Sequence, residues 1–325
     1  MAAAVVVTGC ATAQPAPPSL VADPPLTDDG RAPGAGQADL DRGIAYIEKE
    51  AWDKALPYLD AALEAKPDNA EAHYYRALAQ ARLGNAEAAE TGFEKAIELN
   101  PELTLGRAHL GELYLTSQPP RAQKAIEVLT PAVEAEPKAA DLHQLLGFAY
   151  RMEKNYKEAS KHYQASLAAE DNADVRFDFA DMLFEAGELD EAAAQMRLVL
   201  PKFKTDKAIV AQLAHRFAKA KAYDDCVEAF TVAIGLDQKE PGFFLHRGLC
   251  QHSLQKEEKA RVDYKKAIDL DAKFQPGWYY MGMSWLGDNK RTQALDAFEK
   301  AWRIDKESAI GKAAKEKLDE VRKSR

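Results

Sequence analysis

The sequence predicts an all-α fold of about eight helix-turn-helix repeats and a final capping helix. This prediction rests on two sets of small residues, which we call columns. Within each column, a small residue recurs at a spacing of about 34 residues. Antiparallel helices approach closely only where their crossing points carry small side chains. The first column comprises Ala55, Ala89, Ala125, Ala159, Ala192, Cys226, Ala260 and Ala294. The second comprises Ala62, Ala96, Ala132, Ser166, Val199, Ala233, Ala267 and Ala301.

Proline positions support the same division of the chain. Pro67, Pro101 and Pro137 fall just after second helices, where proline stops a helix. Pro241 and Pro276 fall in the first turn of a helix, where the missing N–H has no cost. Laid end to end, the repeats are 36–69, 70–103, 104–139, 140–172, 173–206, 207–240, 241–274 and 275–308.

Three repeats depart from the pattern. The third has a two-residue insertion at Ser117–Arg121, and Pro57 and Pro131 lie inside second helices, where we expect kinks. The fifth repeat ends early at Pro201. The region 173–220 is therefore interpreted as a degenerate repeat, with a hinge in the array as the alternative.

The last stretch, 309–325, carries an apolar stripe at helical spacing. Ile310, Ala314, Leu318 and Val321 would share one face, and the charged residues between them would face water. Arrays of stacked repeats need such a terminal helix to cover the last apolar flank. The stripe therefore predicts a capping helix.

Large, glycine and aromatic residues at fixed offsets resemble the tetratricopeptide repeat family. The offsets occur in Trp278-Tyr-Tyr-Met-Gly-Met-Ser-Trp285 with Ala294-Leu-Asp-Ala-Phe298, and again in Leu110-Gly-Glu-Leu-Tyr114 with Ala125-Ile-Glu-Val-Leu129. The resemblance implies a right-handed superhelical solenoid whose first helices line a concave groove. It also implies a non-catalytic scaffold that binds a peptide or helical segment of another protein in that groove.

The family's groove positions fall on mixed apolar, aromatic and charged residues in this sequence. Aromatic anchors beside Arg and His suit peptide or helix recognition, although some of them would instead pack against neighbouring first helices. The partner-binding candidates are Tyr74, Arg82, Gln144, Phe148, Arg151, Phe177, Phe184, His215, Lys219, His252 and Tyr279. The same face would include Leu40, Ile44, Leu78, Ala108, Glu112, Asp181, Ala211, Leu245, Leu249 and Met283.

One activity of the family is not expected. Co-chaperones that grip the acidic tails of heat-shock chaperones use a Lys/Asn clamp, and no lysine occupies its first position here. That position reads Leu40, Tyr74, Ala108, Gln144, Phe177, Ala211, Leu245 and Tyr279.

Composition and motifs exclude several other classes. The formal net charge of −9 argues against nucleic acid as a partner, because neutralising phosphate needs a basic face. No metal, cofactor or catalytic motif accompanies the seven histidines, so neither an enzyme nor a cofactor is expected. His73 and His143 share a repeat position with Trp278, which suggests packing. Cys226 and Cys250 are either small core fillers or a disulfide between neighbouring repeats.

The N-terminus suggests a location. Val7-Thr8-Gly9-Cys10 resembles a bacterial lipobox, with lipidation at Cys10, and the run 11–35 reads as a disordered Pro/Gly-rich tether. Residues 1–10 are too short and uncharged for a whole signal, so we expect the true start upstream. These features predict a lipoprotein on the periplasmic face of the outer membrane.

The resemblance extends to bacterial repeat lipoproteins that assemble envelope machines such as pilus secretins, motility complexes and outer-membrane complexes. Two alternatives stay open. One is a cytoplasmic adaptor with a disordered N-terminal tail, and the other is a regulatory subunit of a peptidoglycan enzyme. Either would leave the repeat array unchanged, so only the partner and the compartment distinguish them.

Overall fold

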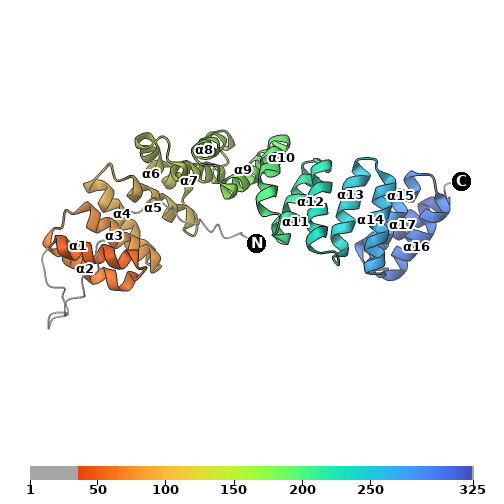
Figure 1. The fold of residues 1–325 in the computed structure, drawn as a ribbon, viewed down its shortest axis with the longest axis horizontal. Helices are drawn as coiled ribbons and strands as arrows, with labels where there is room; N and C mark the ends of the chain where they lie inside the picture. The colour runs from red at the N-terminus through yellow and green to blue at the C-terminus, as the bar shows by residue number, and fades with distance from the viewer. Residues whose placement is uncertain (1–35, 324–325) are drawn as a thin grey trace. The chain divides into compact units, whose positions relative to one another are not determined.

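The computed structural model describes residues 36–323, which form helices connected by short turns and contain no β-strand (Figure 1). The predicted all-α class of helix-turn-helix repeats with a final capping helix is confirmed. The chain divides after Asp171 into two compact units, which we call unit 1 and unit 2. The proposed lipobox and tether lie outside the described residues.

Unit 1 consists of four helix pairs. Its helices are α1 (Gln37–Glu48), α2 (Trp52–Ala65), α3 (Ala70–Arg82), α4 (Ala86–Leu99), α5 (Thr104–Thr116), α6 (Ala122–Ala135), α7 (Ala140–Met152) and α8 (Tyr156–Ala169). Consecutive helices pack against each other, and the first helices also touch in series, α1 with α3, α3 with α5 and α5 with α7. We call the surface formed by these first helices the first-helix face.

Unit 2 continues the repeat with four pairs and the capping helix. Its helices are α9 (Ala173–Ala186), α10 (Leu189–Val199), α11 (Lys207–Lys219), α12 (Tyr223–Leu236), α13 (Pro241–Ser253), α14 (Glu257–Leu270), α15 (Gln275–Gly287), α16 (Arg291–Ile304) and α17 (Ala309–Lys323). A 3₁₀ helix, Leu200–Phe203, follows α10. It contains Pro201, which matches the expected early end of the fifth repeat.

The core lies where the two columns of small residues meet neighbouring helices. Every member of both columns is buried, with an exposed fraction of at most 1%. Glycines complete these contacts where a first helix meets a large side chain. A Cβ on Gly248 would lie 2.6 Å from Cε1 of Tyr264, and one on Gly282 would lie 2.7 Å from Cε1 of Phe298. Close helix contact thus depends on the absence of side-chain atoms at these crossings.

A recurrent hydrogen bond ties each of several first helices to the turn before it. Nε2 of His73 donates to the Pro67 carbonyl oxygen at 2.8 Å, and Nε1 of Trp278 donates to the Ala272 carbonyl oxygen at 3.1 Å. His143 makes the same bond six residues back. The side chain thereby satisfies a carbonyl beyond the end of the preceding helix. The shared repeat position is visible in the sequence, but the hydrogen bond is not.

Two prolines lie inside second helices, Pro57 in α2 and Pro131 in α6. The kinks expected at these prolines stay a prediction. Gly84 and Gly187 each have φ of 83° in the turn between paired helices, a conformation that glycine adopts without strain.

The capping helix covers the end of unit 2. α17 packs against α15 and α16. Ala314 and Leu318 are fully buried and Val321 nearly so, whereas Ile310 is half-buried. The predicted stripe is therefore the packing face of α17. No helix within residues 36–323 is both long and apolar enough to cross a membrane.

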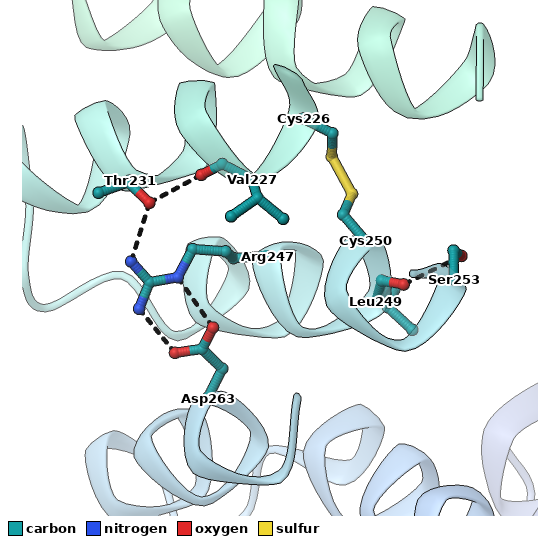
Figure 2. Close-up of a disulfide and its surroundings, with 8 residues drawn as sticks. All are labelled: Cys226, Val227, Thr231, Arg247, Leu249, Cys250, Ser253 and Asp263. Atoms are coloured by element: carbon teal, nitrogen blue, oxygen red, sulfur yellow. Dashed lines mark hydrogen bonds and ion pairs between the residues drawn. A yellow bond between two sulfur atoms is a disulfide. The ribbon is translucent and has the colours of Figure 1, made fainter. Parts of the chain in front are cut away.

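Cys226 and Cys250 are buried, and their sulfur atoms are bonded to each other (Figure 2). Of the two alternatives left open by the sequence, the structure therefore has the disulfide. The bond joins α12 to α13, with a Cα–Cα distance of 6.2 Å. It links two neighbouring repeats, because α12 closes one repeat and α13 opens the next.

Arg247 lies on α13, near the disulfide, and hydrogen-bonds to residues of both neighbouring helices (Figure 2). Its guanidinium donates two hydrogen bonds to the Asp263 carboxylate, at 2.8 and 2.7 Å, and one to Oγ1 of Thr231 at 3.1 Å. The Asp263 side chain is only 4% exposed. Arg247 on α13 therefore connects α12 and α14 while neutralising a buried carboxylate.

Candidate functional site

A small cavity opens on the first-helix face of unit 1 between α3 and α5. Its volume is about 170 Å³. An apolar cavity of roughly 150 Å³ is large enough to hold benzene, so this one suits a single ring or branched side chain. The residues that line it are Leu78, Ala81, Arg82, Phe93, His109, Glu112, Leu113 and Thr116. Leu78, Arg82 and Glu112 are predicted groove residues, and the other five are not.

The floor of the cavity is a stacked pair of rings. The His109 ring lies parallel to Phe93 of α4, with centroids 5.9 Å apart and an interplanar angle of 10°. Nδ1 of His109 donates to the Leu105 carbonyl oxygen at 2.9 Å. Burial lowers the pKa of His109, so its ring is neutral at pH 7 and Nε2 is an acceptor.

Two opposite charges line the same cavity without pairing. Among the described residues, neither Arg82 nor Glu112 has an ion-pair partner within 4 Å. Arg82 is exposed and its guanidinium lies 6.0 Å from the centroid of the Trp52 ring. The cavity thus combines an apolar floor with a cation and an anion that are both available to a ligand.

Tyr74 does not form an open contact surface, contrary to its place among the groove candidates. Its side chain is only 6% exposed. The ring packs beside Phe93 and His109, at centroid distances of 6.0 and 5.7 Å. The reason is geometric, because the first helices α3 and α5 touch and bury the side chain between them.

The candidates on α7 lie next to this region but do not line the cavity. Gln144, Phe148 and Arg151 are all half-buried. Phe148 packs against the core of unit 1. They extend the first-helix face by one helix, because α5 contacts α7.

In unit 2, cations cover the predicted aromatic anchors. The Arg216 guanidinium lies 4.4 Å from the centroid of Phe177 and forms an ion pair with Asp181 at 2.9 Å. Nζ of Lys219 lies 5.7 Å from the centroid of Phe184. Both rings also pack against the core of unit 2. The structure therefore brings Phe177, Phe184 and Lys219 together. However, cations of α11 already contact the two aromatic rings of α9 through cation–π interactions.

Histidines near this contact act as packing groups. The His215 and His246 rings meet edge to face at 4.5 Å, and His246 stacks on Phe230 at 5.5 Å. Burial, followed by repulsion from His215, lowers the pKa of His246 to about 4. Burial also lowers the pKa of His215. Both rings are neutral at pH 7, so they contribute surface and not charge.

His252 and Tyr279 of unit 2 each have a local partner. Nδ1 of His252 lies 2.7 Å from Oε1 of Glu257, which gives this histidine a local partner. Tyr279 is half-buried and packs against Phe298 at a centroid distance of 5.8 Å. Burial and the nearby Tyr280 raise the pKa of Tyr279, so its hydroxyl remains protonated.

Within residues 36–323, no group of three or more His, Cys, Asp or Glu side chains is arranged to hold a metal ion. The cavity of unit 1 brings predicted groove residues together with space, apolar surface and uncommitted charge.

Comparison with known proteins places these repeats in context. Models of the tetratricopeptide repeat match residues 40–103, 151–217 and 242–274, together about half of the chain. Heat shock protein STI1 of Saccharomyces cerevisiae is 33% identical over 107 residues, or 32% of this chain and 18% of that protein. Human mitochondrial import receptor subunit TOM70 is 22% identical over 275 residues, or 80% of this chain and 45% of that protein.

The chain thus spans less than half the length of both curated relatives. Among solved structures, MamA of Desulfovibrio magneticus RS-1 is similar over 51% of this chain and 93% of its own, with 21% identity and a TM-score of 0.48.

Proposed function

Because the chain belongs to the tetratricopeptide repeat family, we propose that it is a protein-interaction scaffold that holds a partner segment on the first-helix face of unit 1. The cavity between α3 and α5 carries this proposal. It offers space for one side chain over Phe93 and His109, beside the charges of Arg82 and Glu112.

The chemistry of the cavity describes the segment it would hold. An apolar side chain fills the hollow, contacts the Phe93 ring and removes the Leu78 and Leu113 surfaces from water, which supplies the affinity. Carboxylate and amide groups on either side of that side chain reach Arg82 and Glu112, which set direction and register. A segment lacking a partner for either charge would leave a desolvated ion and bind less well.

Ala81→Phe is expected to abolish partner capture, because the new ring occupies the hollow while the helix backbone stays unchanged. The test compares proteins retained from an extract of the source cells on immobilised wild-type, Ala81→Phe and Ala168→Phe chains. Ala168 is exposed on α8 of the same unit and serves as the matched control.

A partner of the cavity should fall by about tenfold or more on Ala81→Phe and stay constant on Ala168→Phe. Equal retention on all three chains would refute the proposal, provided that their melting temperatures agree within a few degrees.

We also propose that the scaffold is lipid-anchored through Cys10 on the periplasmic face of the outer membrane and serves an envelope assembly of the secretin, motility or outer-membrane kind. Two features support this location. Val7-Thr8-Gly9-Cys10 resembles a lipobox, and the Cys226–Cys250 bond suits an oxidising compartment.

The anchor predicts a change in fractionation. Cys10→Ser, introduced at the chromosomal locus, should move the protein from the membrane fraction to the soluble fraction, because no acyl chain can then be attached. Thr12→Ser is the control and should leave the protein on the membrane. A Cys10→Ser protein that stays membrane-bound contradicts the anchor. A wild-type protein that is soluble also contradicts it and favours a cytoplasmic adaptor.

A further inference from the structure

Unit 1 has a second hollow on a different face of α5, between the second helices α4 and α6. Its volume is about 470 Å³, and it is open to solvent. The residues that line it are Glu94, Ile97, Glu98, Leu110, Tyr114, Lys124, Glu127 and Val128. We call it the α4–α6 groove. It shares no residue with the first-helix cavity, so it goes beyond the function proposed above.

The groove has an apolar floor and a negative rim. Ile97, Leu110, Tyr114 and Val128 form the apolar part, and Glu94, Glu98 and Glu127 are exposed carboxylates. Glu98 pairs with Lys95 at 2.9 Å, but such an exposed pair on one helix is weak and yields to a better partner.

The one cation in the lining does not cancel this rim. Nζ of Lys124 lies 3.5 Å from Glu90, which is outside the groove lining. Arg121 also binds Glu90, so this carboxylate does not fully neutralise Lys124. The lining nevertheless carries three carboxylates against one ammonium group, and this excess gives the groove a net negative potential.

The Tyr114 side chain in the floor of the groove is held by a hydrogen bond to the rim. Its hydroxyl donates to Oε1 of Glu94 at 3.0 Å. Burial and this hydrogen bond raise the pKa of Tyr114, so the phenol remains protonated and the bond is kept at every physiological pH. The ring is thereby held in one orientation at the boundary between the apolar floor and the acidic rim.

The chain itself shows how this region binds a guanidinium. Arg121 places its guanidinium 4.5 Å from the Tyr114 centroid and donates to both carboxylate oxygens of Glu90 at 2.8 Å. Burial opposes ionisation of Glu90, but the hydrogen bond and charge of Arg121 outweigh it and lower the pKa of Glu90. An aromatic ring and a carboxylate of α4 thus already cooperate in holding one cation.

From this charge complementarity we infer that the α4–α6 groove docks a partner segment in which a lysine or arginine stands beside an apolar side chain. The apolar side chain covers Ile97, Leu110 and Val128. The cationic head reaches Glu94, Glu98 or Glu127, while its aliphatic stem lies along the floor. A cation without an apolar neighbour would pair with the rim carboxylates but leave the apolar floor exposed to water.

The test measures binding of a short fluorescein-labelled, acetylated and amidated peptide of alternating leucine and lysine to the full chain at physiological salt. Glu94→Gln/Glu98→Gln/Glu127→Gln removes the rim. Glu134→Gln/Glu153→Gln/Glu170→Gln is the matched control, because it removes the same charge from exposed positions of unit 1 outside the groove. Spermine is the competitor that carries charge without an apolar part.

The rim variant should raise the Kd by about tenfold or more, the control by less than about twofold, and spermine should compete only weakly. Val128→Glu should also raise the Kd, although it adds a negative charge, because it spoils the apolar floor. Equal losses in both triple variants would mean that only net charge matters. No loss in the rim variant, or spermine competing as well as the unlabelled peptide, would overturn the inference.

Discussion

Arg247→Leu is expected to lower the free energy of unfolding by about 3–5 kcal/mol, the range observed when one partner of a buried ion pair is removed. The substitution leaves the Asp263 carboxylate, 4% exposed, without its two charge-assisted hydrogen bonds. The Thr231 hydroxyl also loses the guanidinium that donates to it. Chemical denaturation of the full chain, followed by circular dichroism at pH 7, measures the loss.

Two further variants make this result specific. Lys265→Leu breaks an exposed ion pair with Asp269 on the same helix, α14, and should cost at most about 1 kcal/mol. Arg247→Leu/Asp263→Leu removes both charges and should recover most of the stability, because no buried ion remains. An Arg247→Leu variant as stable as Lys265→Leu would show that the pair does not hold α13 to α14.

Replacing the disulfide should cost about 3 kcal/mol. Cys226 and Cys250 are 24 residues apart, and closing a loop of that length restricts the unfolded chain by an amount in this range. Alanine is the proper replacement, because the other members of the Cys226 column are alanines. The measurement compares the unfolding midpoint of Cys226→Ala/Cys250→Ala with that of the wild type, with and without reductant.

Reduction of the unfolded wild type should bring its refolded stability close to that of the double variant. Cys10→Ala is the control and should have no effect on the midpoint. A double variant that unfolds at the oxidised wild-type midpoint would contradict a stabilising cross-link between α12 and α13.

The array could be predicted from the sequence because its signal is repeated eight times. Ala55 and Ala62 have counterparts in every repeat, so the crossing points were visible as columns. The capping helix could be predicted for a similar reason, because Ala314, Leu318 and Val321 form a stripe with one possible covering partner. Repetition and periodicity report helix packing directly.

The candidate site was less predictable, because it depends on contacts between helices that no single repeat encodes. Its position in the repeat assigns Tyr74 to the groove, but α5 buries it. The role of Arg216 is not visible in the sequence, because its contacts with Phe177 and Asp181 join different repeats. His109 and Phe93 form the cavity floor only once α4 and α5 are packed.

The disulfide could not be predicted from the sequence for a different reason. Both cysteines occupy positions suited to small buried residues, which favours core packing, and the sequence does not supply the geometry that a disulfide requires. The deciding quantity is the distance between α12 and α13, which is a property of the stacked repeats.

The most direct measurement of the central claim is site-specific photocrosslinking at the first-helix cavity. p-Benzoylphenylalanine at Thr116, an exposed residue of the cavity lining, should trap a partner protein in the source cells. The same group at Ala168 should not trap that partner. Adducts at Thr116 that disappear when Ala81→Phe is added would support a partner segment in the cavity. Identical adducts from both positions, or Thr116 adducts that persist with Ala81→Phe, would contradict it.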